Sequence, residues 1–236
     1  MRLADLRVNR LNTKPVVDGA APSRVPPAIS TTKDGAATGV NSPTLIQVPA
    51  WIPKPLGRFY MYSSAPTGKY IRLSYADDVA GPYTTADSPA IHIADVPICG
   101  GHMSGPTVVV DDAARRIVMH YHCGVCVAGR TYTCGMGGEV VFGASSSDGV
   151  HFETQAKVLW KEGARGVKIG DWHYLFAKHE VFVTKDGLTG LKPVGGVYMS
   201  YPSVAFHQGW LYFTWSELGT KHRINVPLSS IWQSLM

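Results

Sequence analysis

The sequence has no long apolar run, and this excludes one large class of protein. No stretch approaches the ~20 apolar residues that a membrane-spanning helix needs, and the N-terminal segment MRLADLRVNRLNTK lacks the apolar stretch of a signal peptide. We therefore expect no membrane partner. We also expect a soluble protein that is made without an export signal, which predicts a cytoplasmic location.

Cysteine is scarce, with 4 residues in a chain of 236. This number is too small for a disulfide scaffold, and without export we expect Cys99, Cys123, Cys126 and Cys134 to be thiols. Blocks of about five or six like charges are also lacking, although 22 Lys and Arg outnumber 17 Asp and Glu and give a formal net charge of +5. Because a row of phosphate contacts needs clustered charge, we expect no nucleic-acid partner.

Helical periodicity is almost absent, whereas one strand pattern recurs. Several segments contain a short apolar strand, a turn rich in Gly, Asp or Pro, and a strand of alternating aromatic and aliphatic residues, which is typical of a β-hairpin. These segments are PTLIQVPAWIPKPLGRFYMYSS from Pro43, PTVVVDDAARRIVMHYHC from Pro106, RGVKIGDWHYLFAK from Arg165 and PSVAFHQGWLYFTWSE from Pro202. The third strands that follow them are KYIRLSYADDVAGPYT, GEVVFGASSSDGVHFE, HEVFVTKDGLTGL and HRINVPLSSIWQSL.

Repeated units of three or four strands predict an all-β fold, a β-propeller whose blades bury their faces against each other. Four blades are visible and five are favoured, the last closed by the termini, with LRVNRLNTKPVV adding a strand. We predict a single domain over residues 1–236. Residues 18–40, rich in Pro, Gly and small side chains, are expected to be an extended or mobile segment within it. The alternating aromatic residues should be strand core rather than sugar platforms.

Glu162-Gly163 ahead of VKIGDWHYLF, together with the blade layout, resembles the five-bladed β-propeller glycosidases of the arabinanase, β-xylosidase and invertase superfamily. In that superfamily an acid-Gly-Pro start followed by K-x-G-x-Y-Y-L-F marks the blade with the general acid. The resemblance implies inverting hydrolysis by an acid and a base whose carboxyl groups lie ~6.5–9.5 Å apart. The superfamily's base is an Asp directly before the Pro that opens the first blade. Ser42 holds that place here, and Gly105 holds the matching place in the second blade, so two expected carboxylates are missing.

Propeller geometry suggests where functional groups collect. Because antiparallel strands reverse direction across a hairpin, the start of a blade's innermost strand and the end of its second strand lie at the same face. Histidine is frequent at these places, and imidazole is the commonest acid or base near neutral pH. The predicted catalytic residues are Glu162, His102 and His122, and the predicted substrate-binding residues are Arg165, Ser42, Tyr201, His179 and Glu217.

For two of these residues a structural explanation stays open. Glu162 also fits a solvated carboxylate in a turn. Arg165 fits a tie between neighbouring loops as well as a clamp for a substrate carboxylate or hydroxyl.

The segment HYHCGVCVAGRTYTC, residues 120–134, suggests a divalent metal with His120, Cys123 and Cys126 as candidate ligands. Zinc favours Cys and His, and Cys123-x-x-Cys126 has an allowed spacing. His120 and His122 should point to the same face of a strand. A second pair of ligands with proper spacing does not follow, so we expect no cofactor, with a structural or catalytic metal as the alternative.

Together these features predict a carbohydrate-active enzyme, a glycoside hydrolase that cleaves an oligo- or polysaccharide by acid/base catalysis at the propeller axis. One alternative is a polysaccharide lyase-like elimination with a His or Tyr base, in which Arg165 neutralises a uronate; the net basic charge favours it. The other is a propeller that binds glycans or proteins without catalysis. This last reading accounts directly for Ser42 and Gly105.

Overall fold

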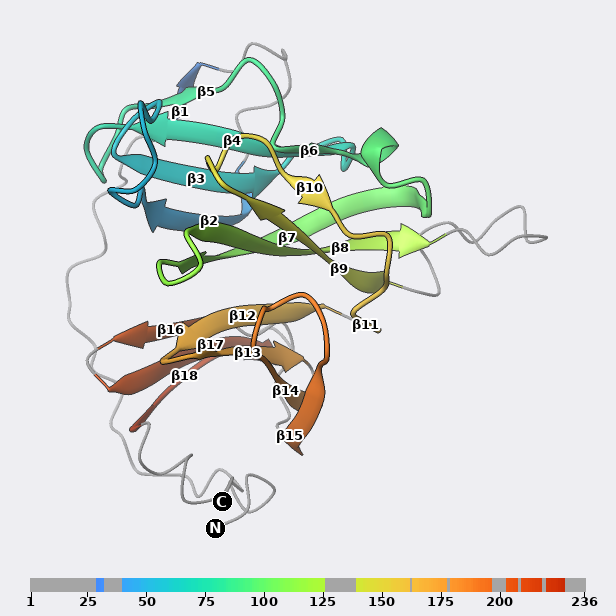
Figure 1. Ribbon diagram of the computed structural model, residues 1–236. Coiled ribbons are helices and arrows are strands. Elements are labelled where there is room, and N and C mark those ends of the chain that lie inside the picture. Colours follow the sequence, from blue (N-terminus) through green and yellow to red (C-terminus); the bar gives the residue numbers. More distant parts are fainter. Residues whose placement is uncertain are drawn as a thin grey trace.

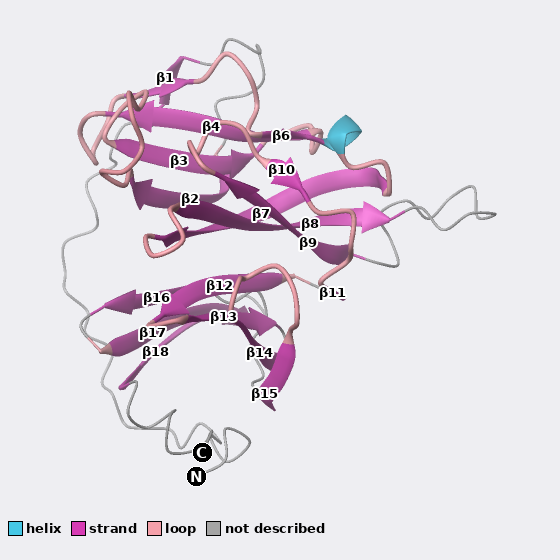
Figure 2. Cartoon of the chain, viewed as in Figure 1, coloured by secondary structure: helices cyan, strands magenta, loops and turns pink. Residues whose placement is uncertain are grey.

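The computed structural model describes residues 29–31, 40–125, 139–161, 163–177, 179–196, 203–207, 209–217 and 220–227. Figure 2 shows that these residues are strands and loops, with one short 3-10 helix, η2 (Ile93–Asp95). The predicted all-β class is confirmed. Among the described residues, no helix has the length and apolar character needed to cross a membrane.

The strands form four sheets that follow one another along the chain (Figure 1). The first sheet contains β2 (Asn41–Gln47), β3 (Phe59–Ser64), β4 (Tyr70–Ala76) and β5 (Tyr83–Thr85), with β1 (Ile29–Thr31) parallel to β5 and β6 (Ile91–His92) beside β4. The second contains β7 (Cys99–Asp111), β8 (Arg116–Val125) and β9 (Glu139–Ser146), with β10 (Glu153–Thr154) and β11 (Trp160–Lys161) both beside β9.

The third sheet contains β12 (Ala164–Ile169), β13 (Trp172–Ala177), β14 (Glu180–Thr184) and β15 (Lys192–Gly196), and the fourth contains β16 (Ser203–His207), β17 (Trp210–Glu217) and β18 (Thr220–Pro227). Each sheet thus begins with one of the predicted hairpins and continues with its predicted third strand. The first strands of successive sheets contact each other, β2 with β7, β7 with β12, and β12 with β16. This is the arrangement of propeller blades around an axis, so we call the sheets blades 1 to 4. The predicted fifth blade falls outside the described residues and stays a prediction.

Residues 18–40 were expected to be extended or mobile. Within that segment the structure describes only β1 and Val40. The predicted N-terminal closing strand also lies outside the described residues.

Aromatic side chains fill the spaces between blades. Tyr60 and Tyr62 of β3 are fully buried, and the Tyr62 hydroxyl donates a hydrogen bond to the Gly149 carbonyl of blade 2 at 2.7 Å. The Phe176 and Phe213 rings meet at 5.0 Å between blades 3 and 4. These residues are core, as the alternating pattern predicts. Tyrosine suits such a position because its ring packs while its hydroxyl finds a partner.

Two Asp-Gly turns close the third strands of blades 2 and 3 with the same geometry. Gly149 and Gly187 have φ angles of 75° and 74°, which glycine adopts without a Cβ penalty. Asp148 accepts hydrogen bonds from the backbone N–H groups of Val150 and His151, and Asp186 accepts them from the next two residues after Gly187. The dipeptides that the sequence marked as turns therefore act as turns.

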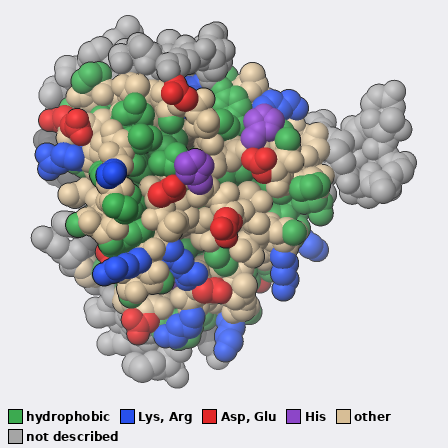
Figure 3. Space-filling view, turned by 45° about the horizontal axis from the view of Figure 1, so that its top comes forward, with side chains coloured by type: hydrophobic (Ala, Val, Ile, Leu, Met, Phe, Trp, Pro, Cys, Tyr) green, Lys and Arg blue, Asp and Glu red, His purple; other side chains and the backbone are tan. Residues whose placement is uncertain are grey.

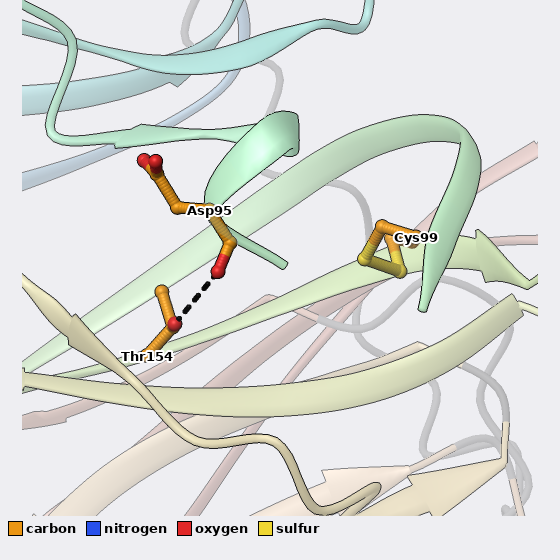
Figure 4. Close-up of a disulfide and its surroundings, with 4 residues drawn as sticks. Asp95, Cys99 and Thr154 are labelled. Atoms are coloured by element: carbon orange, nitrogen blue, oxygen red, sulfur yellow. Dashed lines mark hydrogen bonds between the residues drawn. A yellow bond between two sulfur atoms is a disulfide. The ribbon is translucent and has the colours of Figure 1, made fainter. Parts of the chain in front are cut away.

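Cys99 and Cys123 form a disulfide (Figure 4). They lie near the start of β7 and the end of β8, and the antiparallel register with its bulge brings their Cα atoms to 5.7 Å, within the span that a disulfide bridges. The prediction of free thiols is therefore wrong for this pair. Cys123 as a metal ligand is also wrong, because zinc binds the thiolate. Cys126 and Cys134 lie outside the described residues.

The approach to the disulfide is fastened to the rest of blade 2. Figure 4 shows Thr154 of β10 donating through Oγ1 to the carbonyl of Asp95, which lies in η2 just before β7, at 3.3 Å. The connection between blades 1 and 2 is thus held by this hydrogen bond to β10 and by the disulfide to β8.

A buried ionic cluster joins the far ends of blades 2 and 3, at the hairpin ends of their first strands. Asp111 ends β7 and is 3% exposed. Its Oδ1 lies 2.6 Å from Lys168 Nζ, and its Oδ2 lies 3.3 Å from His173 Nε2 and 3.5 Å from Arg116 Nη2. Burial alone would raise the pKa of Asp111, but hydrogen bonds from Lys168, the Ala114 N–H and His173 lower it to about 2. The carboxylate is therefore ionised and compensates the charges of Lys168 and Arg116.

On one face of the molecule the charge is dispersed. On the face drawn in Figure 3, acidic, basic and histidine side chains lie interspersed among polar and apolar ones. This face has no large field of a single sign, as the scattered charge of the sequence predicts.

Candidate functional site

The starts of the innermost strands and the ends of the second strands coincide in the described blades. Asn41 pairs with Ser64 in blade 1, Ser104 pairs with His122 in blade 2, and Ala164 pairs with Ala177 in blade 3. The structure therefore confirms the geometric rule used to select candidate residues. We call this end of the blades the mouth.

Hydrogen bonds connect three blades at the mouth. The Ser64 hydroxyl of blade 1 lies 2.9 Å from the Ser104 hydroxyl of blade 2, and it accepts the Gly105 N–H at 2.9 Å. Arg165 of blade 3 donates through Nη1 to the Gly105 carbonyl at 3.0 Å and to the Ala164 carbonyl at 3.3 Å. Burial lowers the pKa of Arg165. Through its hydrogen bond to Gly105, Arg165 connects blade 3 to blade 2.

Ser42 and Gly105 occupy equivalent places in blades 1 and 2. Each precedes a proline, each lies at a register shift of its strand, and their φ angles of 49° and 62° are both left-handed. This conformation is unusual for a residue other than glycine, so its recurrence supports the repeat. The Ser42 hydroxyl donates to Asn41 Oδ1 at 3.3 Å. The resemblance leads us to expect a carboxylate at each of these two places, but the chain has a serine at residue 42 and a glycine at residue 105.

The His122 ring fills the space that a side chain at residue 105 would need. A Cβ built on Gly105 would lie 2.6 Å from His122 Cε1, 2.7 Å from its Nδ1 and 3.1 Å from Arg165 Nη1. Real Cβ atoms essentially never approach another atom as closely as the two distances to His122. An imidazole from the second strand thus occupies the space beside residue 105.

Substituting Gly105 by alanine should therefore lower the free energy of unfolding by more than the left-handed backbone conformation alone explains. A left-handed alanine costs about 1–2 kcal/mol, and overpacking against His122 adds about 1–3 kcal/mol. Gly170→Ala is the matched control, because Gly170 has a φ of 57° and nothing within 4 Å of its Cβ position. Chemical denaturation measures both variants, and equal losses would contradict this account of His122.

Three polar side chains converge beside Gly105, one from each of the first three strands of blade 2. His102 Nε2 lies 3.2 Å and His122 Nε2 lies 3.8 Å from Glu139 Oε1. The two imidazole rings meet edge to face, with centroids 5.8 Å apart. The side chains of His102 and Glu139 are each 36% exposed, and that of His122 is 13% exposed. We call these three residues the His-His-Glu cluster.

The surroundings of His122 shift its pKa in opposite directions. Burial lowers the pKa of His122, the Glu139 carboxylate raises it, and the charges of Arg165 and His102 lower it. The net direction is downward. A neutral imidazole at the mouth can accept a proton near neutral pH.

Glu139 was not selected from the sequence. The rule considered only the first two strands of each blade, yet the third strand reverses direction again, and Gly124 near the end of β8 pairs with Glu139 at the start of β9. Extending the rule to the third strand would have found this residue.

His120 lies apart from this cluster. His120 is fully buried, its Nε2 lies 2.7 Å from the Gly187 carbonyl, and a Cβ on Gly166 would lie 2.7 Å from its Nδ1. Burial lowers its pKa to about 4. His120 is a neutral core residue between blades 2 and 3, so the prediction that it is a metal ligand is wrong.

His179 is exposed and immediately precedes β14, near the mouth end of blade 3. Glu217 ends β17, and only its backbone belongs to the described part of the chain. Glu162, Tyr201 and Cys126 lie outside the described residues. Gly163, which follows Glu162, is described, and its Cβ position lies 3.8 Å from His122 Nδ1.

No protein-family model matches the sequence, and no curated protein matches it either. Solved structures do match the fold. One is a GH43_1 enzyme from Xanthomonas citri, with 11% identity and a TM-score of 0.55 over 75% of this chain and 66% of that one. Another is an α-L-arabinofuranosidase from Clostridium thermocellum, with 15% identity and a TM-score of 0.55 over 75% of this chain and 61% of that one.

A third similar structure is an exo-β-1,3-galactanase from Phanerochaete chrysosporium with bound β-1,3-galactotriose. It has 12% identity and a TM-score of 0.57 over 79% of this chain, and the match covers 47% of the galactanase. The chain thus spans between about half and two thirds of the length of these enzymes. At this identity the similarity establishes the fold, and the predicted likeness to the propeller glycosidases is confirmed at that level.

Proposed function

We propose that this protein, whose fold is similar to that of the propeller glycosidases, is a glycoside hydrolase that cleaves an oligo- or polysaccharide at the mouth. The observation that carries the proposal is the convergence of His102, His122, Glu139 and Arg165 at this end of a glycosidase fold. The galactanase with a bound trisaccharide adds support for a carbohydrate substrate.

Glu162 is the proposed general acid. It would protonate the glycosidic oxygen of the leaving group while a base takes a proton from the attacking water. Support comes from its place in the sequence, directly before Gly163, whose Cβ position is 3.8 Å from His122. Gly163, the residue that follows Glu162, therefore lies next to the His122 imidazole.

His122 is the proposed base, with His102 beside it. Neither Ser42 nor Gly105 offers a carboxylate, and the lowered pKa of His122 keeps its ring neutral and able to accept a proton. Glu139 would hold the imidazoles in place and stabilise the imidazolium that forms. Arg165, Ser42, Tyr201, His179 and Glu217 remain the proposed substrate-binding residues.

Replacing Glu162 by glutamine should lower the rate of glycan hydrolysis by about 100-fold, the lower end of what a general acid contributes. The amide keeps the size of the side chain and cannot donate the proton to the leaving oxygen. Release of reducing ends from plant, algal and microbial glycans measures the rate. Glu153→Gln is the control, because Glu153 is an exposed carboxylate of β10, and it should retain full activity.

A wild-type protein that releases no reducing ends from any glycan would sink the hydrolase proposal. The missing carboxylates at residues 42 and 105 favour a second candidate, a propeller that binds glycans without cleaving them. In that case glycan binding would persist in wild-type protein and in Glu162→Gln alike, with no product from either.

A further inference from the structure

The His-His-Glu cluster has the composition of a metal site. His102 comes from β7, His122 from β8 and Glu139 from β9, and one ligand atom from each lies within 4.8 Å of the other two. The Nε2 atom of each histidine faces the same carboxylate oxygen, at 3.2 Å and 3.8 Å. Ligands placed about 2.0–2.1 Å from a tetrahedral zinc ion lie roughly 3.3 Å apart. The cluster is therefore close to the size that one ion requires.

The ligand types select the class of ion. Two imidazoles and one carboxylate form a three-ligand set that zinc uses when a fourth position stays open for water or substrate. Imidazole suits zinc, copper, iron and nickel, whereas calcium takes 6–8 oxygen ligands and magnesium prefers oxygens with several waters. The cluster thus fits a transition metal and does not fit calcium.

The three side chains are supported by the fold and remain reachable. All come from paired strands of one sheet, and the His122 ring is confined by Gly105 on its other side. His102 and Glu139 keep 36% of their side-chain surface exposed, so an ion and a fourth ligand can enter from solvent. Arg165 lies nearby and its charge opposes a cation, which favours an anionic fourth ligand.

We infer that His102, His122 and Glu139 bind one divalent transition-metal ion of the zinc class, with an open coordination position at the mouth. This inference goes beyond the proposed function and does not depend on it. Metal binding and proton acceptance at His122 Nε2 exclude each other, so bound zinc should inhibit the hydrolysis proposed above, and that hydrolysis is measured on chelator-treated protein.

Binding of Zn²⁺ to the full chain, stripped with a chelator, tests the inference by titration calorimetry. Binding of Co²⁺ followed by visible absorption provides a second readout that reports nitrogen ligands. We expect one equivalent of either ion to bind, and no comparable binding of Ca²⁺ or Mg²⁺. His102→Ala and Glu139→Gln should each weaken binding by about tenfold or more, since even outer-shell partners of metal ligands contribute about 10–100-fold.

His151→Ala is the matched control. His151 also pairs with a carboxylate, its Nδ1 lying 2.8 Å from Asp148 Oδ2, and its side chain is 83% exposed. This variant should bind Zn²⁺ like wild type. Circular dichroism verifies folding, and His102→Ala removes a part-exposed ligand with little change in packing. Failure of wild type to bind either ion, or binding that is equal in wild type, His102→Ala and Glu139→Gln, would overturn the inference.

Discussion

Asp111→Asn is expected to lower the free energy of unfolding by about 3–5 kcal/mol, the usual cost of removing one partner from a buried ion pair. The amide keeps the shape of the side chain and loses its charge. Lys168, His173 and Arg116 would then face each other without the carboxylate that lies within 2.6–3.5 Å of them. Because Asp111 and Arg116 belong to blade 2 and the other two to blade 3, the loss should weaken the contact between these blades.

Urea denaturation of both proteins measures this effect, with Asp171→Asn as the control. Asp171 is an exposed carboxylate in the turn between β12 and β13, so its substitution should change stability by less than about 0.5 kcal/mol. An Asp111→Asn variant as stable as the control would show that the buried cluster does not stabilise the fold.

The same cluster predicts how wild type responds to acid. The pKa of Asp111 is about 2 in the folded protein against an ordinary value of 3.8. A carboxylate whose pKa is lower in the folded protein stabilises the fold fully at pH values above its pKa in the unfolded chain. This stabilisation is lost as the pH falls towards the pKa of the folded protein. Wild type should therefore lose about 2 kcal/mol between about pH 4 and pH 2 through this group, and Asp111→Asn should lack that component.

Removing the Cys99–Cys123 disulfide is the second large expected effect. The bond closes a loop with a sequence separation of 24 residues, and loop-closure entropy predicts a loss of about 3 kcal/mol. The double variant Cys99→Ala/Cys123→Ala removes the bond and leaves apolar side chains at two buried positions. Thermal and urea denaturation should show the loss.

Reduction provides the control for this prediction. A thiol reductant should destabilise wild type by a similar amount and leave the double variant unchanged, which also separates this bond from any reaction at Cys126 or Cys134. Wild type that is indifferent to reductant while its disulfide is demonstrably broken would contradict the prediction. Such a bond persists in an oxidising compartment and is reduced in an ordinary cytosol.

Much of the fold could be predicted because its signals are local. The alternation of side chains in segments such as PSVAFHQGWLYFTWSE reflects the period of a strand, and Asp148-Gly149 marks a turn through glycine's freedom at positive φ. The same local pattern identified Ser42 and Gly105 as equivalent places. These predictions needed no knowledge of distant contacts.

The candidate site was predicted less completely because it depends on registers across strands. A bulge in β7 decides that Cys99 reaches Cys123, and no spacing in the sequence reveals a bulge. Likewise, His120 and His122 were correctly assigned to one face of a strand. Only the packing of blade 3 shows that His120 is buried against Gly166, whereas His122 lies at the mouth. Glu139 became visible only once β9 was placed beside β8.

The contact between Gly105 and His122 limits which pairs of side chains these two residues can carry. The two residues compete for one volume, so a carboxylate at residue 105 requires the His122 ring to shift or to be replaced. An aspartate before Pro106 should be tolerated better when residue 122 also carries a smaller side chain. A single substitution to aspartate at residue 105 therefore meets a steric obstacle that a simultaneous change at residue 122 removes.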